Sequence, residues 1–344
     1  MGVSAESAAR AFALPGEPSL APLGGGHINA SWLVTAGGAR FVLQRLNTHV
    51  FPRPALVMEN VARVTAHLAA ALPPGTPDTE RRALRMVPAR DDAMWHVDDA
   101  GAWWRMYAYV EGTVTRETPR DTDDAYQAAL AFGRFQRLLG SYAGPPLHET
   151  IPGFHDTPRR VAALEASAAR DAAGRLAESR AELDALLARR ALARALHDMP
   201  TRAVHNDAKL TNVLLDARTS EGLCVVDLDT VMPGLSLHDF GDLARSTASG
   251  VPEDERDLSR IAVRRELFDA LAAGFLDGTG DLLGGAERAA LATAARVITF
   301  EQAVRFLADW LDGDVYYRTD PERPRHNIER ARAQITLLKA LEQH

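Results

Sequence analysis

Lysine and cysteine are both scarce in this chain of 344 residues. Of its 39 basic residues only Lys209 and Lys339 are lysines, so a function that requires a lysine has two candidates. The single cysteine, Cys224, excludes an intramolecular disulfide framework and is typical of proteins in a reducing compartment. Because Cys224 stands in an apolar run, we expect it to be a core residue.

Excess positive charge and long apolar runs are also missing. The formal net charge of −7 argues against a nucleic-acid-binding surface, which would need a basic footprint. Arg, Asp or Gly interrupts every apolar stretch well before the roughly 20 residues that span a bilayer. The N-terminal residues lack the basic start and apolar core of a signal peptide. We therefore expect a cytoplasmic protein that binds neither nucleic acid nor membrane, whereas the oligomeric state stays open.

The pattern of apolar residues changes near residue 110. The apolar fraction of 46% excludes disorder for most of the chain, and the length suits two lobes. Strand-like runs separated by Gly- and Pro-rich turns are predicted at 31–34, 41–43, 83–87 and 101–109. Helices are predicted at 54–71, 121–139, 158–196 (one helix or a helical hairpin), 253–275, 286–310 and 321–341. We expect an α+β, bilobal fold, with a small antiparallel β-sheet lobe at 1–110 and a mainly helical lobe at 111–344.

The densest group of chemically reactive side chains lies in residues 205–212, here called the catalytic loop, and in the predicted hairpin that follows (212–215 and 223–228). The hairpin brings Asp207, Asn212 and Asp227 into one small volume. Amide and carboxylate oxygens suit Mg²⁺ carried in with a polyphosphate, so Asn212 and Asp227 are the candidate metal ligands. Asp207 would orient or deprotonate an attacking hydroxyl, and Lys209 would offset charge on the transferring phosphoryl group. This His-x-Asp-x4-Asn spacing with a later Asp is that of protein-kinase-like phosphotransferases.

Three neighbouring residues have less specific readings. We expect His205 to fix the backbone of the catalytic loop by hydrogen bonds. Asp229 either joins the metal ligands or caps the following turn. Asp242 is interpreted as a buried carboxylate that ties the catalytic loop to the start of a helix.

The nucleotide is expected in the N-terminal lobe. Three glycines, Gly24, Gly25 and Gly26, precede a strand and would let backbone amides approach phosphates. A strand lysine paired with a helix glutamate is the next expected part, yet this lobe has no lysine. Gln44 falls at the expected position, and Arg45 beside it would pair with Glu59 if the strand shifts by one residue. The segment 107–110, which includes Tyr109, would bind adenine through its backbone.

In these motifs the sequence resembles the aminoglycoside-phosphotransferase-like kinase superfamily and, more closely, its N-acetylhexosamine 1-kinases. The broad resemblance rests on HNDAKLTN (205–212), VVDLD (225–229) and GDLAR (241–245). The closer one rests on GGGHIN (24–29), FVLQRLNTHVF (41–51), VMEN (57–60), CVVDLDTVMPG (224–234) and EQAVRFLADWLDGD (301–314). The Gln44-Arg45 pair in place of the strand lysine belongs to that closer pattern.

The resemblance implies ATP- and Mg²⁺-dependent phosphorylation of the anomeric hydroxyl of an N-acetylhexosamine, giving a sugar 1-phosphate. It also implies that Asp207 is the catalytic base and that Asn212 and Asp227 hold the metal. His27 and Asn29 would contact the sugar from the side of the glycines. The rest of the sugar pocket would be shaped by Phe240, Arg305, Trp310 and Tyr316 or Tyr317.

Three other functions are compatible with parts of the sequence. A kinase of an aminoglycoside, choline-like or other small alcohol would use an acidic pocket, for which Asp309, Asp312 and Asp314 are available. A glycosyltransferase would use Asp227-Leu228-Asp229 as its metal-binding D-x-D, although βαβ units should then precede that motif. A nucleotide-binding pseudokinase would explain the missing strand lysine.

Overall fold

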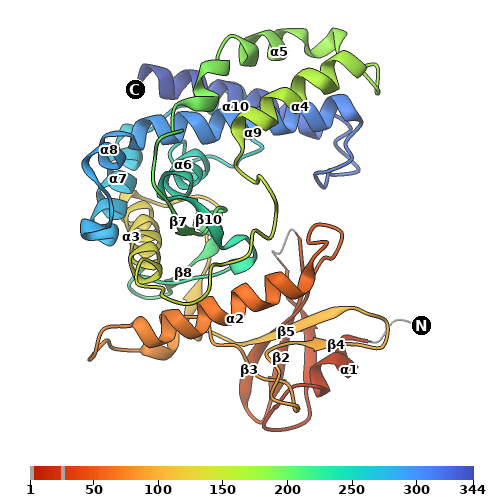
Figure 1. Ribbon diagram of the computed structural model, residues 1–344, viewed down its shortest axis with the longest axis vertical. Helices are drawn as coiled ribbons and strands as arrows, with labels where there is room; N and C mark the ends of the chain where they lie inside the picture. Colours follow the sequence, from red (N-terminus) through yellow and green to blue (C-terminus); the bar gives the residue numbers. More distant parts are fainter. Residues whose placement is uncertain (1–3, 25–27) are drawn as a thin grey trace.

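A five-stranded antiparallel sheet forms the N-terminal part of the protein, and helices dominate the rest (Figure 1). The computed structural model describes residues 4–24 and 28–344, so the predicted site residues Gly25, Gly26 and His27 lie outside the described residues. The strand order is β1-β2-β3-β5-β4. These strands are β1 (Ser19–Pro22), β2 (Ala30–Ala36), β3 (Ala39–Arg45), β4 (His96–Val97) and β5 (Trp103–Ala108).

The two faces of this sheet have different neighbours. Val34, Leu43 and Trp104 are buried on one face, against helix α1 (Ala5–Arg10) and Phe12. Side chains alternate along a strand, so the next residues face the opposite way, toward the rest of the protein. Gln44 of β3 and Arg105 of β5 are register partners on this second face. The sheet therefore presents polar groups to the C-terminal part of the chain.

Helix α2 (Pro54–Ala71) lies between the sheet and the C-terminal helices (Figure 1). It occupies the predicted range and begins with a proline, whose missing N–H costs nothing in the first turn. Its buried Asn60 donates hydrogen bonds from Nδ2 to the carbonyls of His148 (2.8 Å) and Val231 (3.1 Å). This helix is thus tied to the segment that follows the hairpin and to the segment around His148.

The remaining helices are α3 (Thr122–Leu139), α4 (Thr157–Arg170), α5 (Arg180–Leu187), α6 (Ser236–Thr247), α7 (Arg265–Thr279), α8 (Gly285–Ala289), α9 (Leu291–Asp312) and α10 (His326–Gln343). Helices α3 and α7 pack with their backbones in contact. A Cβ atom added to Gly274 would lie 2.3 Å from the carbonyl oxygen of Tyr126, so a side chain there would force the helices apart. Helices α4, α5, α9 and α10 gather at the end of the molecule away from the sheet (Figure 1).

Five short strands carry the segments that flank the catalytic loop. They are β6 (Thr113–Val114), β7 (Thr201–Val204), β8 (Val213–Asp216), β9 (Gly222–Val225) and β10 (Met232–Leu235). Strands β8 and β9 form the predicted hairpin, and Cys224 is buried in it as predicted. Strands β7 and β10 pair antiparallel, a pairing that the sequence analysis did not predict. The catalytic loop leaves β7, and β10 lies beside that strand.

Several predicted elements differ from the structure. The helix expected at 286–310 is divided into α8 and α9, and the helix expected from residue 321 begins at His326. The strand expected at 83–87 is reduced to an isolated bridge between Met86 and Tyr107. The region 158–196 forms the helical-hairpin alternative, because α4 ends at Asp171 in the left-handed conformation (φ 42°). The helix expected from residue 253 begins only at Arg265.

The antiparallel sheet and the many helices agree with the predicted α+β class, and the lobe boundary at residue 110 stays a prediction. Within the described ranges, no helix combines the length and the apolar character needed to cross a membrane.

Candidate active site

The backbone of the catalytic loop is held by a buried carboxylate on α6. Asp239 accepts hydrogen bonds from the amides of His205 (2.9 Å) and Asn206 (2.7 Å), and Gln136 donates a third from Nε2 (2.7 Å). Burial raises the pKa of Asp239, although these donors and His205 favour its charged form. The prediction that Asp242 ties the loop to a helix is wrong. Asp239 does so one helical turn earlier, and Asp242 pairs with Arg245.

His205 and Asn206 fix the loop against the strands around it. The Nε2 atom of His205 lies 2.9 Å from the carbonyl oxygen of Val226, which supports its predicted structural role. Asn206 has a left-handed backbone (φ 65°), and its Nδ2 donates to the carbonyls of Thr230 (3.0 Å) and Met232 (3.2 Å). Asparagine tolerates this conformation better than most residues. The position of the next residue, Asp207, is therefore set by the buried protein around it.

Asp207 and Lys209 form an ion pair with 2.6 Å between Oδ1 and Nζ. Asn212 donates from Nδ2 to the carbonyl oxygen of Asp207 (2.9 Å). Burial alone would raise the pKa of Asp207, but the charge and hydrogen bond of Lys209 outweigh it and lower the value to about 2. The structure thus brings together the predicted base and the predicted phosphate-binding lysine, with Asp207 ionised.

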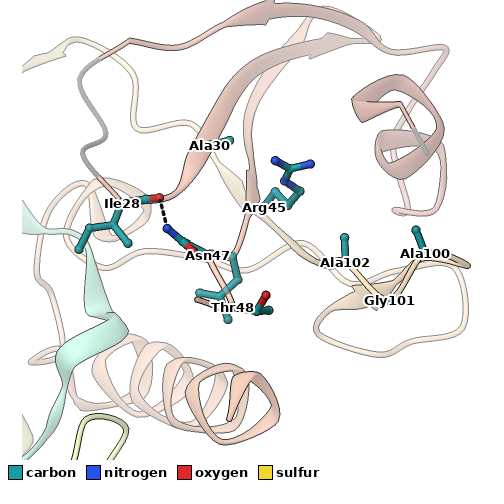
Figure 2. A pocket seen from close by; sticks show the side chains of 9 residues that line it. Ile28, Ala30, Arg45, Asn47, Thr48, Ala100, Gly101 and Ala102 are labelled. Carbon is teal, nitrogen blue, oxygen red and sulfur yellow. Dashed lines mark hydrogen bonds between the residues drawn. The ribbon is translucent and has the colours of Figure 1, made fainter. Parts of the chain in front are cut away.

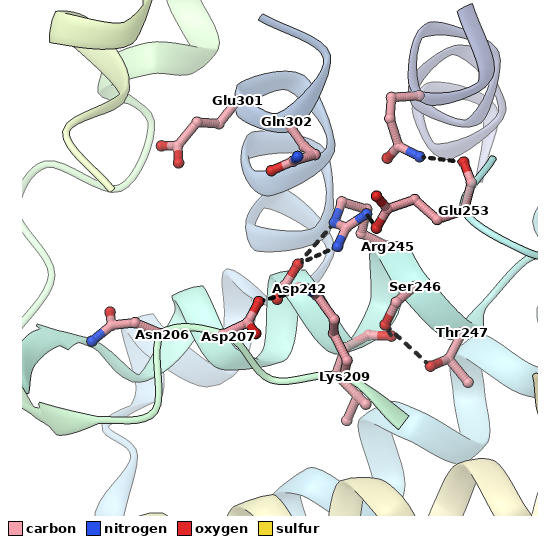
Figure 3. A network of polar contacts seen from close by, with 12 residues as sticks. Asn206, Asp207, Lys209, Asp242, Arg245, Ser246, Thr247, Glu253, Glu301 and Gln302 are labelled. Carbon is pink, nitrogen blue, oxygen red and sulfur yellow. Dashed lines mark hydrogen bonds and ion pairs between the residues drawn. The ribbon is translucent and has the colours of Figure 1, made fainter. Parts of the chain in front are cut away.

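A buried arginine organises the acidic residues beside Lys209 (Figure 3). Arg245 is 1% exposed at its side chain and bridges Asp242 (2.7 Å) and Glu253 (2.5 Å). Burial opposes the charge of Lys209, but Asp207, Asp242 and Glu253 together raise its pKa. Lys209 is therefore a fixed cation next to the predicted base.

Asp227 lies just after the hairpin with a left-handed backbone (φ 62°). Across residues 4–24 and 28–344, no side chain or backbone group forms a hydrogen bond or ion pair with its carboxylate. Asp227 is exposed to solvent as a residue, but loss of hydration from the protein packed around its carboxylate, followed by repulsion from Asp229 and Asp207, raises its pKa to about 6. This unpaired carboxylate would gain from a bound cation, and with the Oδ1 atom of Asn212 it offers the hard oxygen donors that Mg²⁺ prefers.

The residues present fit a metal that arrives with its nucleotide. In the described part of the chain, no three His, Cys, Asp or Glu side chains gather into a metal-binding group. Mg²⁺ commonly takes one or two carboxylates from the protein and completes its shell with phosphate oxygens and water. Asn212 and Asp227 would therefore hold the metal together with the phosphates of the nucleotide.

Asp229 has both of its carboxylate oxygens engaged by the protein. Oδ1 pairs with Nη1 of Arg105, and Oδ2 accepts a hydrogen bond from Nδ2 of Asn29 (2.6 Å). Its backbone carbonyl accepts a further bond from Thr150 (3.0 Å). These contacts give Asp229 a role in joining segments, which differs from both the metal-binding and the turn-capping roles considered from the sequence. They also place Asn29 at this junction.

Arg105 was not identified from the sequence, although it is a buried cation at the site. It is 1% exposed and donates to Oε1 of Gln44 from Nε (3.0 Å) and Nη2 (2.8 Å). One signal was available, because Arg105 is the only charged residue in the apolar strand Trp103–Ala108. A charge in such a strand needs a buried partner, and that partner is Asp229.

The predicted Arg45–Glu59 pair is wrong. Arg45 lies on the face of the sheet opposite Gln44, and its side chain points into a hollow of about 390 Å³ (Figure 2). None of the residues that line this hollow belongs to the catalytic loop or the hairpin. Glu59 pairs instead with Arg63 and with His148 (2.7 Å between Oε2 and Nε2). Strand β3 keeps its regular alternation, so no one-residue shift brings Arg45 to the site.

The remaining predicted nucleotide contacts lie at the edges of the sheet. The amide of Tyr109 donates to the carbonyl of Arg40 (3.1 Å), and the Arg40 guanidinium stacks 4.3 Å from the centre of the Tyr109 ring. Its amide is therefore engaged by the protein. Gly24 has open space where a Cβ atom would be. The half-buried Leu33 and Val42 are register partners on the face that carries Gln44.

Aromatic rings surround Arg305 of α9. Its guanidinium carbon lies 4.9 Å from the ring centre of Phe154, 5.6 Å from Tyr317 and 6.0 Å from Tyr316. Burial disfavours its charge, but nearby groups, Asp207 among them, raise its pKa. Arg305, Tyr316 and Tyr317 thus lie together, with Arg305 within electrostatic reach of the predicted base, and Phe154 joins them without having been predicted.

The predicted sugar contacts of Phe240 and Trp310 are wrong. Phe240 is fully buried and packs 5.9 Å and 5.4 Å, between ring centres, from Phe268 and Phe275 of α7. Trp310 is 3% exposed in the core of α4, α5, α9 and α10, beneath the Arg175 guanidinium (3.9 Å). Two side chains five positions apart on a helix point in directions that differ by about 140° around its axis, so Arg305 and Trp310 lie on different sides of α9.

The three acids near the end of α9 are already engaged. Asp309 accepts hydrogen bonds from the amides of residues 315–317, which fixes the segment carrying the two tyrosines. Asp312 pairs with Arg170 (2.8 Å), and Asp314 pairs with Arg175 (2.6 Å). These carboxylates therefore do not form the free acidic pocket that a cationic acceptor would use.

Comparison with known proteins identifies the family. Residues 19–292 match the phosphotransferase enzyme family, and the chain belongs to that family. This assignment removes the glycosyltransferase alternative.

Solved structures share the fold at low sequence identity. A microcompartment-associated aminopropanol kinase has a TM-score of 0.67 and 18% identity, over 98% of this chain and 97% of that chain. An aminoglycoside phosphotransferase from Alicyclobacillus acidocaldarius has a TM-score of 0.62 and 14% identity, over 100% and 96%. A spectinomycin phosphotransferase in complex with ADP and spectinomycin has a TM-score of 0.57 and 10% identity, over 95% and 93%. These likenesses extend over nearly the whole chain and show a kinase-like fold.

Proposed function

We propose that this member of the phosphotransferase enzyme family transfers the γ-phosphoryl group of ATP to the anomeric hydroxyl of an N-acetylhexosamine. The products would be a sugar 1-phosphate and ADP. The observation that carries the choice of acceptor is Arg305, a cation among three aromatic rings close to Asp207. The resemblance of the GGGHIN and EQAVRFLADWLDGD segments to N-acetylhexosamine 1-kinases supports the same choice.

The acceptor side suits a neutral sugar better than an ammonium group. Arg305 is in contact with no carboxylate among the described residues, so its charge would repel an ammonium group placed beside it. An N-acetyl carbonyl can instead accept hydrogen bonds from the guanidinium. The rings of Phe154, Tyr316 and Tyr317 offer apolar surface for the C–H groups of a pyranose.

Asp207 is positioned to accept the proton of the acceptor hydroxyl. The acceptor oxygen attacks the γ-phosphorus of ATP, its proton passes to the Asp207 carboxylate, and the bond to the β,γ-bridging oxygen breaks as ADP leaves. With its pKa lowered to about 2, Asp207 is a weak base. It therefore accepts the proton late, when the oxygen has begun to bond to phosphorus, and much of its contribution is orientation.

Lys209 and the metal ligands would handle the charge of the phosphates. Lys209 is held as a cation beside Asp207 and would offset negative charge on the transferring group. Asn212 and Asp227 would hold Mg²⁺, which would neutralise part of the negative charge of the phosphates. The nucleotide would lie against the face of the sheet that carries Leu33, Val42 and Gln44, near Gly24 and Tyr109.

A kinase of an amino-bearing alcohol is the second candidate. It is favoured by the aminopropanol kinase and the spectinomycin phosphotransferase that share the fold. The two candidates differ in the charge of the acceptor nitrogen, which an acetyl group removes. Matched sugars with and without that group therefore separate them.

The test is Mg²⁺-dependent ADP release with N-acetylglucosamine and glucosamine as the matched pair. N-acetylgalactosamine, galactose, aminopropanol, choline and spectinomycin complete the panel, and phosphorus NMR locates the new phosphate. We expect turnover with an N-acetylhexosamine and an anomeric phosphate. Turnover only with amines would show that the acceptor is an amino alcohol and not an N-acetylhexosamine. Nucleotide binding without any turnover would support the pseudokinase alternative.

A further inference from the structure

A buried cation occupies the sheet face where the catalytic lysine of related kinases is expected. Gln44 stands at the lysine position and is neutral. Arg105 is its register partner on the neighbouring strand, and two of its nitrogens donate to the Gln44 side-chain oxygen. The third nitrogen pairs with Asp229. A positive charge therefore lies one strand away from Gln44, and the Gln44 side chain accepts two of its hydrogen bonds.

The partner of this cation belongs to the segment that carries the candidate metal ligand. Asp229 follows Asp227 by two residues, within the 3-10 turn Leu228–Thr230. With Oδ1 on Arg105 and Oδ2 on Asn29, the Asp229 carboxylate cannot rotate without losing a buried bond. Its orientation therefore fixes the turn, and the turn fixes the direction in which Asp227 points.

We propose that Arg105 is a positioning residue that takes the place of the strand lysine and acts through Asp229 to hold the Asp227 carboxylate ready for a Mg²⁺–nucleotide. This inference rests on the proposed kinase function, but not on the identity of the acceptor. Asp207, Asp227 and Asp229 crowd negative charge into a small volume, and a buried guanidinium compensates part of it. Asn29, which directly precedes β2, donates a hydrogen bond to the same carboxylate, so two segments of the sheet are tied to the metal-binding turn.

The experiment measures nucleotide binding by calorimetry, with and without Mg²⁺, on four variants. R105K keeps the charge. R105Q removes it but leaves Asp229 buried without its partner. R105Q/D229N removes both charges and keeps a pair that can hydrogen-bond. Q44K/R105Q moves the charge back to the β3 position, and R45Q on the opposite face of the same sheet is the matched control.

We expect the affinity of R105Q/D229N for Mg²⁺–ADP to fall about 10- to 100-fold, the usual effect of losing a group that orients a metal ligand. Its affinity for ADP in the presence of EDTA should stay close to that of the native protein. R105K should lose less, Q44K/R105Q should recover much of the loss, and R45Q should bind like the native protein. This pattern would distinguish positioning from a purely structural role.

Two results would overturn the proposal. One is a folded R105Q/D229N protein that binds Mg²⁺–ADP as tightly as the native protein. The other is an R105Q/D229N protein that does not fold, because that result would show that the Arg105–Asp229 ion pair serves the stability of the fold and not the positioning of Asp227. Since no acceptor is present in these measurements, they are independent of the sugar panel. If none of the sugars is phosphorylated, the proposed acceptor is disproved, but the nucleotide-binding test is unaffected.

Discussion

The carboxylate of Asp207 and the ammonium group of Lys209 are in direct contact, with 2.6 Å between Oδ1 and Nζ. This contact keeps the candidate base charged and oriented before any substrate arrives. It also means that Lys209 has to share its charge between Asp207 and an incoming phosphate. The first prediction follows from this pair.

Replacing Asp207 by Asn should reduce kcat by about 10²–10⁴-fold, the usual contribution of a positioned acid or base. Affinity for the nucleotide should survive, because Lys209 and the metal that Asn212 and Asp227 would hold remain to bind the phosphates. Steady-state kinetics and ADP titration measure the two quantities. The exposed Asp198 is the control, and D198N should behave like the native protein. Near-native turnover in D207N would show that another group is the base.

Binding of Mg²⁺–ADP should weaken as the pH falls through about 6. The pKa of Asp227 is raised to about 6, so its carboxylate is charged above that pH and becomes protonated below it. A metal ligand has to be deprotonated, so protonation competes with the metal. Calorimetry between pH 5 and 8 at a fixed concentration of Mg²⁺–ADP checks this. D227N should bind weakly at every pH, and a flat profile for the native protein would contradict the assignment.

Replacing Arg305 by Met should lower kcat/KM for the acceptor and leave the affinity for the nucleotide unchanged. Hydrogen bonds to a charged group contribute about 1.5–3 kcal/mol, which corresponds to about 10- to 150-fold in kcat/KM for the acceptor. The preference for N-acetylglucosamine over glucosamine should shrink in the same variant. Arg296 lies on the same helix and makes a local bond to the Ala292 carbonyl, so R296M is the control. An equal loss of kcat/KM with both sugars would show that Arg305 does not discriminate between these acceptors.

Phe240 should matter for stability and not for acceptor binding. Truncation of a fully buried phenylalanine to alanine costs about 3–5 kcal/mol in the free energy of unfolding. Thermal unfolding of F240A should therefore occur at a clearly lower temperature. The milder F240L variant should keep the native KM for the acceptor. A raised acceptor KM in a stable F240L protein would show that Phe240 does contribute to the sugar pocket.

Sequence patterns correctly predicted those helices and strands that are specified within a short segment of the chain. Helix α2 occupies the predicted range because its apolar spacing and its proline at the start are local features. The β8–β9 hairpin was predicted for the same reason. The segment 83–87 has strand-like residues, but it runs beside β5 with one isolated bridge. Its pairing depends on a neighbour about twenty residues away, which composition does not reveal.

The site shows the same limit. The catalytic-loop spacing brought Asp207, Lys209, Asn212 and Asp227 together, because a hairpin folds these residues back on one another. The side chain of Arg105 joins Asp229, which is 124 residues away in the sequence. No local pattern specifies that contact. Phe240 and Trp310 were misplaced because a resemblance of segments does not tell which face of a helix meets the core.

The cross-strand position of Arg105 has a consequence for how such chains are classified. A search along the sequence for a lysine at the Gln44 position finds none and would sort this protein with inactive relatives. A search in space finds a guanidinium directly opposite that position on β5. Under the role proposed for Arg105, the charge that a strand lysine would supply comes from the neighbouring strand, and a comparison of single sequence positions does not detect it.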